Sequence, residues 1–309
     1  MSSSLSFRSH ADSLEDSELA ELLKTIAALS PDVRQEFPHR LKLGKENKNK
    51  YGEITAELDV WANDFIVKRL GETGLVNTIH SEELSKPLQC NADAPFHVSM
   101  DPLDGSSNIV SNNAFGTIVG IYRQPLPCKG REQVASLYKL YGPLTTLVYT
   151  AGRGVHEFVK HRKGEGKNAF FLLNEDMQLP EPGSVYGVGG DPLQWYDSFK
   201  KFVEDLVSVK KLKNRYSGAF VADFSQVLHY GGFFAYPGTK KAPQGKFRLF
   251  FEGHPMGMIV EQAGGRSSNG RISLLDVSAD DVDARTPVYV GNRELIAELE
   301  SLLKKELVH

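Results

Sequence analysis

Segments with the pattern of strands and segments with the pattern of helices follow one another in mixed order along this chain, without an internal repeat. Residues 116–122 and 144–150 are rich in β-branched and aromatic residues, as strands are. Residues 195–209 instead carry apolar side chains at helical spacing. Because neither type occupies a continuous block, the pattern predicts an α+β or layered α/β fold.

The chain has 309 residues, which is enough for two domains. Prolines and glycines between residues 173 and 190 interrupt the periodic segments. We therefore expect two tightly joined halves, residues 1–180 and 181–309. Further helices are expected over residues 19–29, 57–70, 220–228, 255–263 and 294–307, and further strands over 98–100, 155–159 and 247–251.

Composition and charge exclude several classes of protein. The formal net charge is −3, so we expect neither a nucleic-acid partner nor a membrane partner. No apolar run approaches the ~18 residues of a membrane span, and the first residues lack the apolar core of a secretory signal. The two cysteines, Cys90 and Cys128, form no Cys-x-x-Cys pair, which favours free thiols. A cytoplasmic enzyme is the expected class.

The segment MDPLDGSSN is the most informative part of the chain for chemistry. It holds Asp101 and Asp104, with Pro102 fixing φ between them and Gly105 permitting a sharp turn afterwards. The two carboxylates and the carbonyl of Leu103 are oxygen ligands of the kind that hard divalent cations prefer. Backbone N–H groups after the second aspartate can hold a phosphate if they open a turn. A simple hairpin turn has the same composition, so both interpretations remain open at this point.

Other acidic residues flank expected strands and helices. Glu82 and Glu83 follow the apolar run 75–79, and Asp59 lies in the helix expected over 57–70, six residues after Glu53. A pair of adjacent glutamates is common on protein surfaces and by itself decides nothing.

Another acidic residue directly follows the strand expected over 247–251. Glu252 ends this apolar run, and a buried carboxylate there needs a partner to offset the loss of its water. Lys246 and Arg248 alternate with it at a period of two, so we expect all three side chains on one face. An arginine beside metal-bound carboxylates is well suited to bind a phosphate through two hydrogen bonds.

These residues lie in longer strings by which the chain resembles the class I fructose-1,6-bisphosphatases, within the metal-dependent, lithium-sensitive phosphatase superfamily. The resemblance runs from about residue 52 to residue 276. Its marks are the strings LDVWAND, SEE, DPLDGSSN, GTIVGIYR, RYSGAFVAD, YGGFFAYP, GKFRLFFE and EQAGG. It implies the layered α-β-α-β-α sugar phosphatase fold and a homotetramer.

The resemblance also implies an activity. This is the Mg²⁺-dependent hydrolysis of the 1-phosphate of D-fructose 1,6-bisphosphate, in gluconeogenesis or Calvin-type sugar phosphate metabolism. The alternatives are a sedoheptulose-1,7-bisphosphatase, an enzyme of dual specificity, and a catalytically silent homologue. The presence of every acid that the chemistry needs counts against the silent homologue.

The resemblance further implies a role for each matching residue. Two to three Mg²⁺ per site, or Mn²⁺, would be held by Glu82, Asp101, Leu103 through its carbonyl, Asp104 and Glu252. The attacking water would be positioned and deprotonated by Glu83, Asp59 and Glu53. The sugar bisphosphate would be bound by Asp104, Gly105, Ser106, Ser107, Arg215, Tyr216, Tyr236, Lys246 and Arg248. Of these, Arg215 would be supplied to the site of a neighbouring subunit.

The chain departs from the family pattern at several places. Gly189 and Pro192 stand where an Asn and a Tyr usually help to hold the distal phosphate, and they could leave room for one more carbon. The Thr-Gly-Glu-Leu-Thr loop that binds AMP in animal enzymes is missing near residues 14–20, although Arg123 remains. We therefore expect AMP inhibition to be weak or absent.

Overall fold

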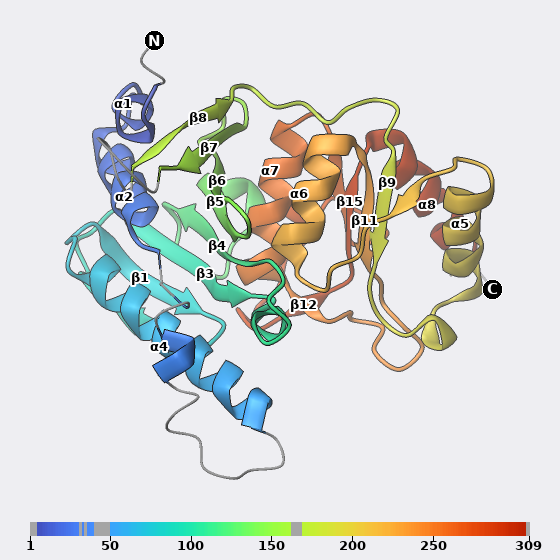
Figure 1. The fold of residues 1–309 in the computed structure, drawn as a ribbon, viewed down its shortest axis with the longest axis horizontal. Helices are drawn as coiled ribbons and strands as arrows, with labels where there is room; N and C mark the ends of the chain where they lie inside the picture. The colour runs from blue at the N-terminus through green and yellow to red at the C-terminus, as the bar shows by residue number, and fades with distance from the viewer. Residues whose placement is uncertain (1–4, 31–32, 34–35, 40–49, 162–168, 307–309) are drawn as a thin grey trace.

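The structure is a computed structural model that describes residues 5–30, 33, 36–39, 50–161 and 169–306. Over these ranges two large β-sheets and three groups of helices stack as five layers in the order α-β-α-β-α (Figure 1). The layered α+β fold expected from the sequence is confirmed. Among the described residues, no helix combines the length and the hydropathy that crossing a bilayer requires.

The larger sheet carries the chemistry-bearing strand. Its order is β2-β1-β3-β4-β5-β6-β7-β8, with β1 and β3 parallel and the other neighbours antiparallel. The strands are β1 (Val76–Ser81), β2 (Leu88–Gln89), β3 (Phe96–Asp104), β4 (Phe115–Tyr122), β5 (Gln133–Tyr141), β6 (Thr145–Thr150), β7 (His156–Lys160) and β8 (Phe170–Asn174). All nine residues of β3 are buried, because the strand lies in the interior of the sheet with helical layers on both faces.

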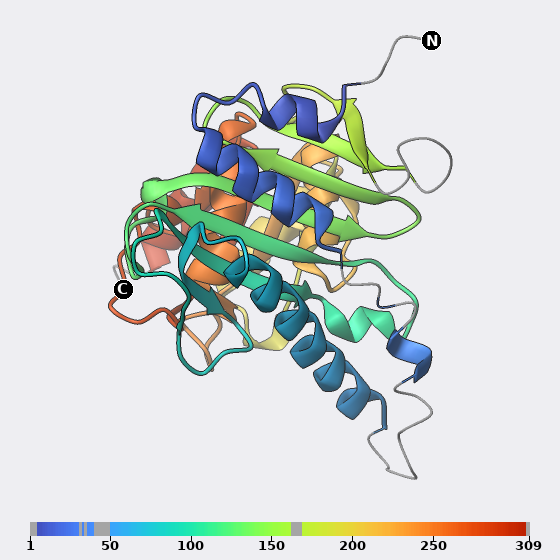
Figure 2. The ribbon, with the colours of Figure 1, turned by 90° about the vertical axis from the view of Figure 1, so that its left-hand side faces the viewer.

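Helices α1 (Phe7–Ala11), α2 (Ser17–Ala28) and α4 (Lys50–Gly71) cover the outer face of this sheet (Figure 2). The carboxylate of Asp16 caps the N-terminus of α2 by accepting a hydrogen bond from the N–H of Leu19 at 3.0 Å. The apolar stripe of α2 packs into the core under the sheet, as its spacing predicts. Helix α4 begins at Lys50, whereas the sequence predicts a start at residue 57. Its first turns extend past the sheet, where no apolar pattern is needed.

The middle layer consists of α6 (Phe220–Tyr230) and α7 (His254–Gln262), which lie between the two sheets. The smaller sheet has the order β10-β9-β11-β15-β13, and α5 (Asp197–Ser208) and α8 (Arg293–Glu306) cover its far face. Its strands are β9 (Val185–Val188), β10 (Lys213–Asn214), β11 (Gly232–Tyr236), β13 (Arg266–Ser268) and β15 (Val288–Gly291). Most residues of α6 and α7 are buried because both of their sides face a sheet.

The strand expected over residues 247–251 is wrong beyond its first two residues. Strand β12 (Phe247–Arg248) pairs with β14 (Arg285–Thr286), and the chain then forms a π-helical turn over Leu249–Gly253 that continues into α7. The alternation of side chains therefore ends at Arg248, and Glu252 does not share a strand face with it. A short apolar run has no period that distinguishes a strand from a buried helical turn.

Candidate active site

A pocket of about 250 Å³ opens where the end of β3 meets the middle helices and the π-helical turn. Carboxylates dominate its lining, and Lys246 and Arg285 are the two cationic residues among the described ones that line it. The acidic residues are Asp59, Glu82, Glu83, Asp101, Asp104, Asp223 and Glu252. So much uncompensated negative charge is costly unless cations bind in the pocket.

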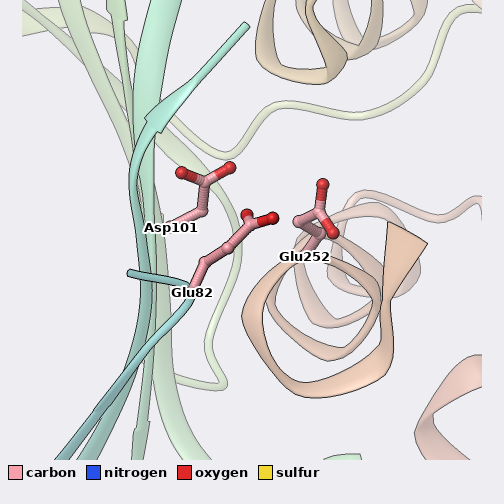
Figure 3. A group of neighbouring side chains, drawn as sticks. All are labelled: Glu82, Asp101 and Glu252. Atoms are coloured by element: carbon pink, nitrogen blue, oxygen red, sulfur yellow. The ribbon is translucent and has the colours of Figure 1, made fainter. Parts of the chain in front are cut away.

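Three of these acids converge from three segments of the chain (Figure 3). Glu82 follows β1, Asp101 lies in β3, and Glu252 lies in the π-helical turn. The parallel register pairs Ser81 with Met100, so Glu82 and Asp101 emerge side by side at the same sheet edge. One carboxylate oxygen from each of the three residues lies within 4.8 Å of the others.

The chemistry of this group fits a divalent metal ion. Burial first, and then the neighbouring carboxylate of Glu82, holds the pKa of Asp101 and of Glu252 well above the usual range. Among the described residues one cation contacts the group directly, through the 2.5 Å ion pair from a terminal guanidinium nitrogen of Arg248 to Glu82 Oε1. Three convergent carboxylates with one cationic partner provide the all-oxygen ligand set that Mg²⁺ and similar ions prefer.

The end of β3 forms a tight turn beside this group. Gly105 adopts φ of +74°, and a Cβ there would lie 2.3 Å from the Cβ of Ala219, so only glycine fits. A short 3₁₀-helix over Ser106–Ile109 follows. Burial raises the pKa of Asp104 to about 7, although its Oδ2 accepts a hydrogen bond from the N–H of Val221 at 2.7 Å. The strand and turn expected from the sequence are therefore both present.

Two further acids lie on the α4 side of the pocket. Burial, and then the charge of Glu83, raises the pKa of Asp59 to about 7, and Oδ2 of Asp59 accepts a hydrogen bond from Ser106 Oγ at 3.1 Å. Burial and the charge of Glu82 raise the pKa of Glu83. A carboxylate such as Asp59, whose pKa lies near neutral pH, is suited to general-base chemistry. Glu53 belongs to α4, but its side chain lies outside the described part of the structure.

The opposite side of the pocket carries the residues expected to bind the sugar and its distal phosphate. Tyr216, Tyr236 and Lys246 all line it, and Lys246 Nζ lies 5.3 Å from the centre of the Tyr236 ring. Two expected residues lie apart from this lining. Arg215 is exposed and donates to the carbonyl of Asn214, and Arg248 is engaged by Glu82 and Asp283.

Two charged residues that line the pocket were not among those expected. Asp223 accepts hydrogen bonds from the N–H groups of Ser217 and Gly218, at 2.6 and 3.3 Å, and so fixes the loop that follows Tyr216. It ends the string RYSGAFVAD, which is a signal that could have identified it. Arg285 donates to the carbonyl of Lys246 at 2.5 Å, and only the pairing of β12 with β14 brings it there.

The space expected beside Gly189 is filled. A Cβ at this position would lie 2.5 Å from the ring of Tyr236 and 2.8 Å from the hydroxyl of Tyr216. The glycine therefore allows the two tyrosines to pack closely, and it does not leave room for an additional carbon of the substrate.

Comparison with known proteins identifies the family. The profile described as Fructose-1-6-bisphosphatase, N-terminal domain, matches residues 10–172, and the C-terminal domain profile matches residues 179–304. A class 1 fructose-1,6-bisphosphatase of Natronomonas pharaonis is 41% identical over 293 residues, covering 95% of this chain and 99% of the relative. A class 1 enzyme of Methanocorpusculum labreanum is 41% identical and covers 92% of this chain and 87% of the relative.

Solved structures agree with these sequence matches. The holo form of fructose-1,6-bisphosphatase from Leishmania major superimposes with a TM-score of 0.84 at 29% identity, covering 97% of this chain and 99% of the other. The fold is thus that of a metal-dependent phosphatase, and the acid-lined pocket offers oxygen ligands that suit a metal ion. The chain belongs to the class 1 fructose-1,6-bisphosphatase family.

Proposed function

We propose that this chain hydrolyses the 1-phosphate of D-fructose 1,6-bisphosphate and releases fructose 6-phosphate and inorganic phosphate. The observation that carries the proposal is the convergence of the Glu82, Asp101 and Glu252 carboxylates beside the Gly105 turn. A cation site next to backbone N–H groups suits a phosphate ester. The family relatives named for this activity cover almost the whole chain.

We further propose that two to three Mg²⁺ ions, or Mn²⁺ ions, bind in this pocket. Their ligands would be Glu82, Asp101 and Glu252, with Asp104 and the carbonyl of Leu103 completing the set. Ions held there would lower the pKa of a bound water and offset the charge on the phosphate oxygens. Burial, and then the charge of Glu82, raises the pKa of Asp101 and of Glu252, which supports this assignment because a bound cation would stabilise the ionised carboxylates against both effects.

The residues of the chain itself provide the proton acceptors. Asp59 and Glu83 lie next to the turn that would hold the 1-phosphate, and Asp59 is hydrogen-bonded to Ser106. In our proposal one of them accepts a proton as the water oxygen bonds to phosphorus and the bond from phosphorus to the C1 oxygen breaks. The C1 oxygen takes a proton from solvent water as it leaves and becomes the hydroxyl of fructose 6-phosphate. Glu53, expected to assist, stays a proposal from the sequence.

The same proposal assigns the two phosphates to opposite sides of the pocket. The N–H groups of Gly105, Ser106 and Ser107, with Arg248, would bind the 1-phosphate, and Tyr216, Tyr236 and Lys246 would bind the sugar and the distal phosphate. Arg215 is exposed and directly precedes Tyr216, which lines the pocket. This exposure suits its proposed role in the site of a neighbouring subunit. A homotetramer, a cytoplasmic location and a division into residues 1–180 and 181–309 are likewise proposals.

Phosphate release tests this function directly. Purified protein with saturating Mg²⁺ should release phosphate from fructose 1,6-bisphosphate and lose this activity in excess chelator. Sedoheptulose 1,7-bisphosphate should be a poorer substrate, since Tyr236 fills the space beside Gly189. Lys246→Met should raise KM for the bisphosphate about tenfold, whereas Lys241→Met, a change in the same exposed loop, should leave it unchanged. If neither bisphosphate releases phosphate, the protein is a silent homologue.

A further inference from the structure

The three convergent carboxylates do not belong to one rigid segment. Glu82 and Asp101 are fixed to the larger sheet, whereas Glu252 lies on the π-helical turn Leu249–Gly253, directly before α7. The distance from Glu252 to the other two therefore depends on how this turn and the first residues of α7 rest on the sheet. The N–H of Arg248 donates to Glu252 Oε2 at 2.6 Å and fixes the side chain on the turn, whereas contacts at the junction decide where the turn itself lies.

Serine hydroxyls of two strands bond to the main chain of the turn and of the start of α7. Ser99 in β3 donates from Oγ to the carbonyl of Phe250 at 2.8 Å, and Ser136 in β5 donates from Oγ to the carbonyl of Pro255 at 2.8 Å. Both serines are fully buried, so water does not compete for these bonds. The two bonds join the sheet to the main chain before and after Glu252.

The bond from Ser99 meets a need created by the sequence of the turn. In a π-helix each carbonyl accepts from the N–H five residues later, and the N–H of His254 bonds to the carbonyl of Leu249 in this way. The corresponding partner of the Phe250 carbonyl would be Pro255, which has no N–H. Phe250 is buried, and a buried carbonyl without a donor is costly. Ser99 supplies the donor that the proline cannot.

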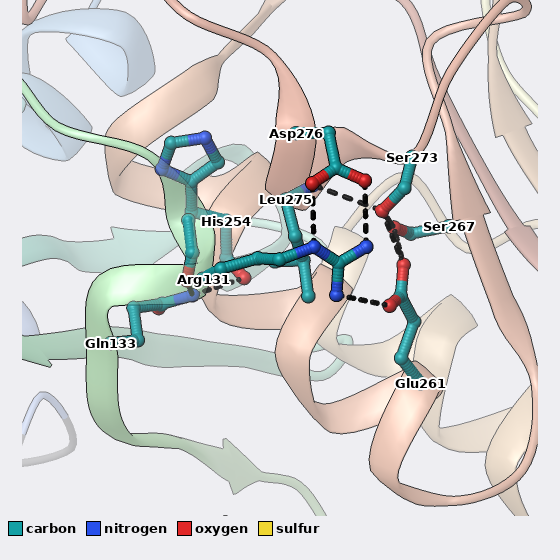
Figure 4. A network of polar contacts seen from close by, with 9 residues as sticks. Arg131, Gln133, His254, Glu261, Ser267, Ser273, Leu275 and Asp276 are labelled. Carbon is teal, nitrogen blue, oxygen red and sulfur yellow. Dashed lines mark hydrogen bonds and ion pairs between the residues drawn. The ribbon is translucent and has the colours of Figure 1, made fainter.

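A third donor comes from the beginning of β5. The side-chain amide of Gln133 donates from Nε2 to the carbonyl of His254 at 2.9 Å and to the carbonyl of Gly130 at 2.9 Å (Figure 4). The other end of α7 is held separately, because Arg131 forms ion pairs with Asp276 at 2.5 Å and with Glu261 at 3.5 Å. Helix α7 is therefore held at both ends: Gln133 of the larger sheet holds its start, next to the pocket, and Arg131, in the short 3₁₀-helix before β5, holds its far end.

A glycine makes the close approach possible. Gly120 in β4 pairs with Ser99 on one side and with Ser136 on the other, so the three residues form a row across neighbouring strands. A Cβ at Gly120 would lie 2.9 Å from Ser99 Oγ, 2.9 Å from Gln133 Oε1 and 3.1 Å from Pro255 Cγ. We call these four residues the seat of α7: Ser99, Gly120, Gln133 and Ser136.

We propose that the seat of α7 positions Glu252 for metal binding, with Ser99 as its principal residue. Ser99 and Asp101 are two residues apart in β3, so they project from the same face of the strand. One strand thus carries one metal-binding carboxylate and fixes the main chain that presents another. The inference rests on the metal-binding part of the proposed function. Ser99, Gln133 and Ser136 are positioning residues that act through Glu252 and touch neither substrate nor metal.

The test separates position from general stability. Ser99→Ala removes the donor to Phe250, and Ser136→Ala removes one bond from a strand without a metal ligand. The matched control is Ser267→Ala, since Ser267 is equally buried and bonds to Glu261 at the far end of α7, at 2.7 Å. For each variant, Mn²⁺ binding to the substrate-free protein is measured by electron paramagnetic resonance. Unfolding in chelator, KM and the Mg²⁺ concentration for half-maximal activity are measured alongside.

The proposal expects a specific pattern. Ser99→Ala weakens Mn²⁺ binding about tenfold and raises the half-maximal Mg²⁺ concentration by a similar factor, while KM for the bisphosphate at saturating Mg²⁺ stays unchanged. Ser136→Ala has a smaller effect in the same direction, and Ser267→Ala lowers stability without changing Mn²⁺ affinity. Unchanged Mn²⁺ affinity in both seat variants, or an equal loss in the control, overturns the proposal. If the parent protein binds Mn²⁺ but hydrolyses no bisphosphate, the proposed activity is refuted and the proposed role of the seat of α7 still stands. If the parent protein binds no Mn²⁺, both proposals are refuted.

Discussion

Replacing Asp101 by Asn should stabilise the metal-free protein while abolishing its response to metal. In the parent, Asp101 lies within 4.8 Å of the Glu82 and Glu252 oxygens. Two full charges at that distance repel each other by about 3 kcal/mol at an effective dielectric constant of about 20. Burial and the neighbouring acids raise the pKa of Asp101, so part of this charge is already absent. We expect a net gain of about 1–2 kcal/mol, or about 2–5 °C in Tm.

The assay compares thermal unfolding in chelator and in Mg²⁺, together with phosphate release. Asn can still accept the hydrogen bond that Leu103 donates to Asp101 at 3.0 Å, so the turn should be retained. Mg²⁺ should raise the Tm of the parent and not that of Asp101→Asn, whose kcat/KM should fall at least about 100-fold. Asp280→Asn makes the same chemical change at an exposed site and should alter neither quantity. The reasoning would be refuted if metal-free Asp101→Asn had a lower Tm than the metal-free parent and if Mg²⁺ raised the Tm of both proteins equally.

Three further outcomes follow from contacts elsewhere in the fold. AMP should not inhibit, since Arg123 is engaged by Asp16 in a 2.5 Å ion pair; a saturable inhibition curve would contradict this. The hydrogen bond to Glu157 raises the pKa of His229, so this pair stabilises the fold fully below about pH 6.5 and loses that effect as pH rises through the raised pKa. His229→Gln should flatten this part of the pH profile in urea unfolding. Lys139→Met should cost about 2 kcal/mol in the same assay, because buried Nζ satisfies three carbonyls at the end of α2; equal stability would contradict it.

Local signals in the sequence were sufficient to predict the turn at the end of β3. Asp101, Pro102, Asp104 and Gly105 are close in sequence, so the turn and the carboxylates it presents follow from the properties of neighbouring residues. The helices α5, α6 and α7 follow from their apolar spacing for the same reason. The order of the layers, by contrast, came from the resemblance to a known family.

Features that depend on contacts between residues far apart in the sequence could not be predicted from local patterns. Strand β5 contains Lys139, which looks like a solvent-facing residue but is fully buried because it bonds to the end of α2. Glu252 follows an apolar run that forms a π-helical turn, since the seat of α7 supplies donors from the other half of the chain. Arg285 enters the pocket through strand pairing alone. In each case the deciding partner lies far away in the sequence.

The separation of the three carboxylates along the chain has a consequence for biosynthesis. Glu82 and Asp101 are made early, whereas Glu252 is among the last sixty residues of a 309-residue chain. A chain still emerging from the ribosome can form the larger sheet but cannot present all three carboxylates together. Binding of the proposed metal by all three carboxylates would therefore have to follow the synthesis of Glu252 and the docking of α7 on the larger sheet. Truncated chains that end before Glu252 would lack the third carboxylate of this group.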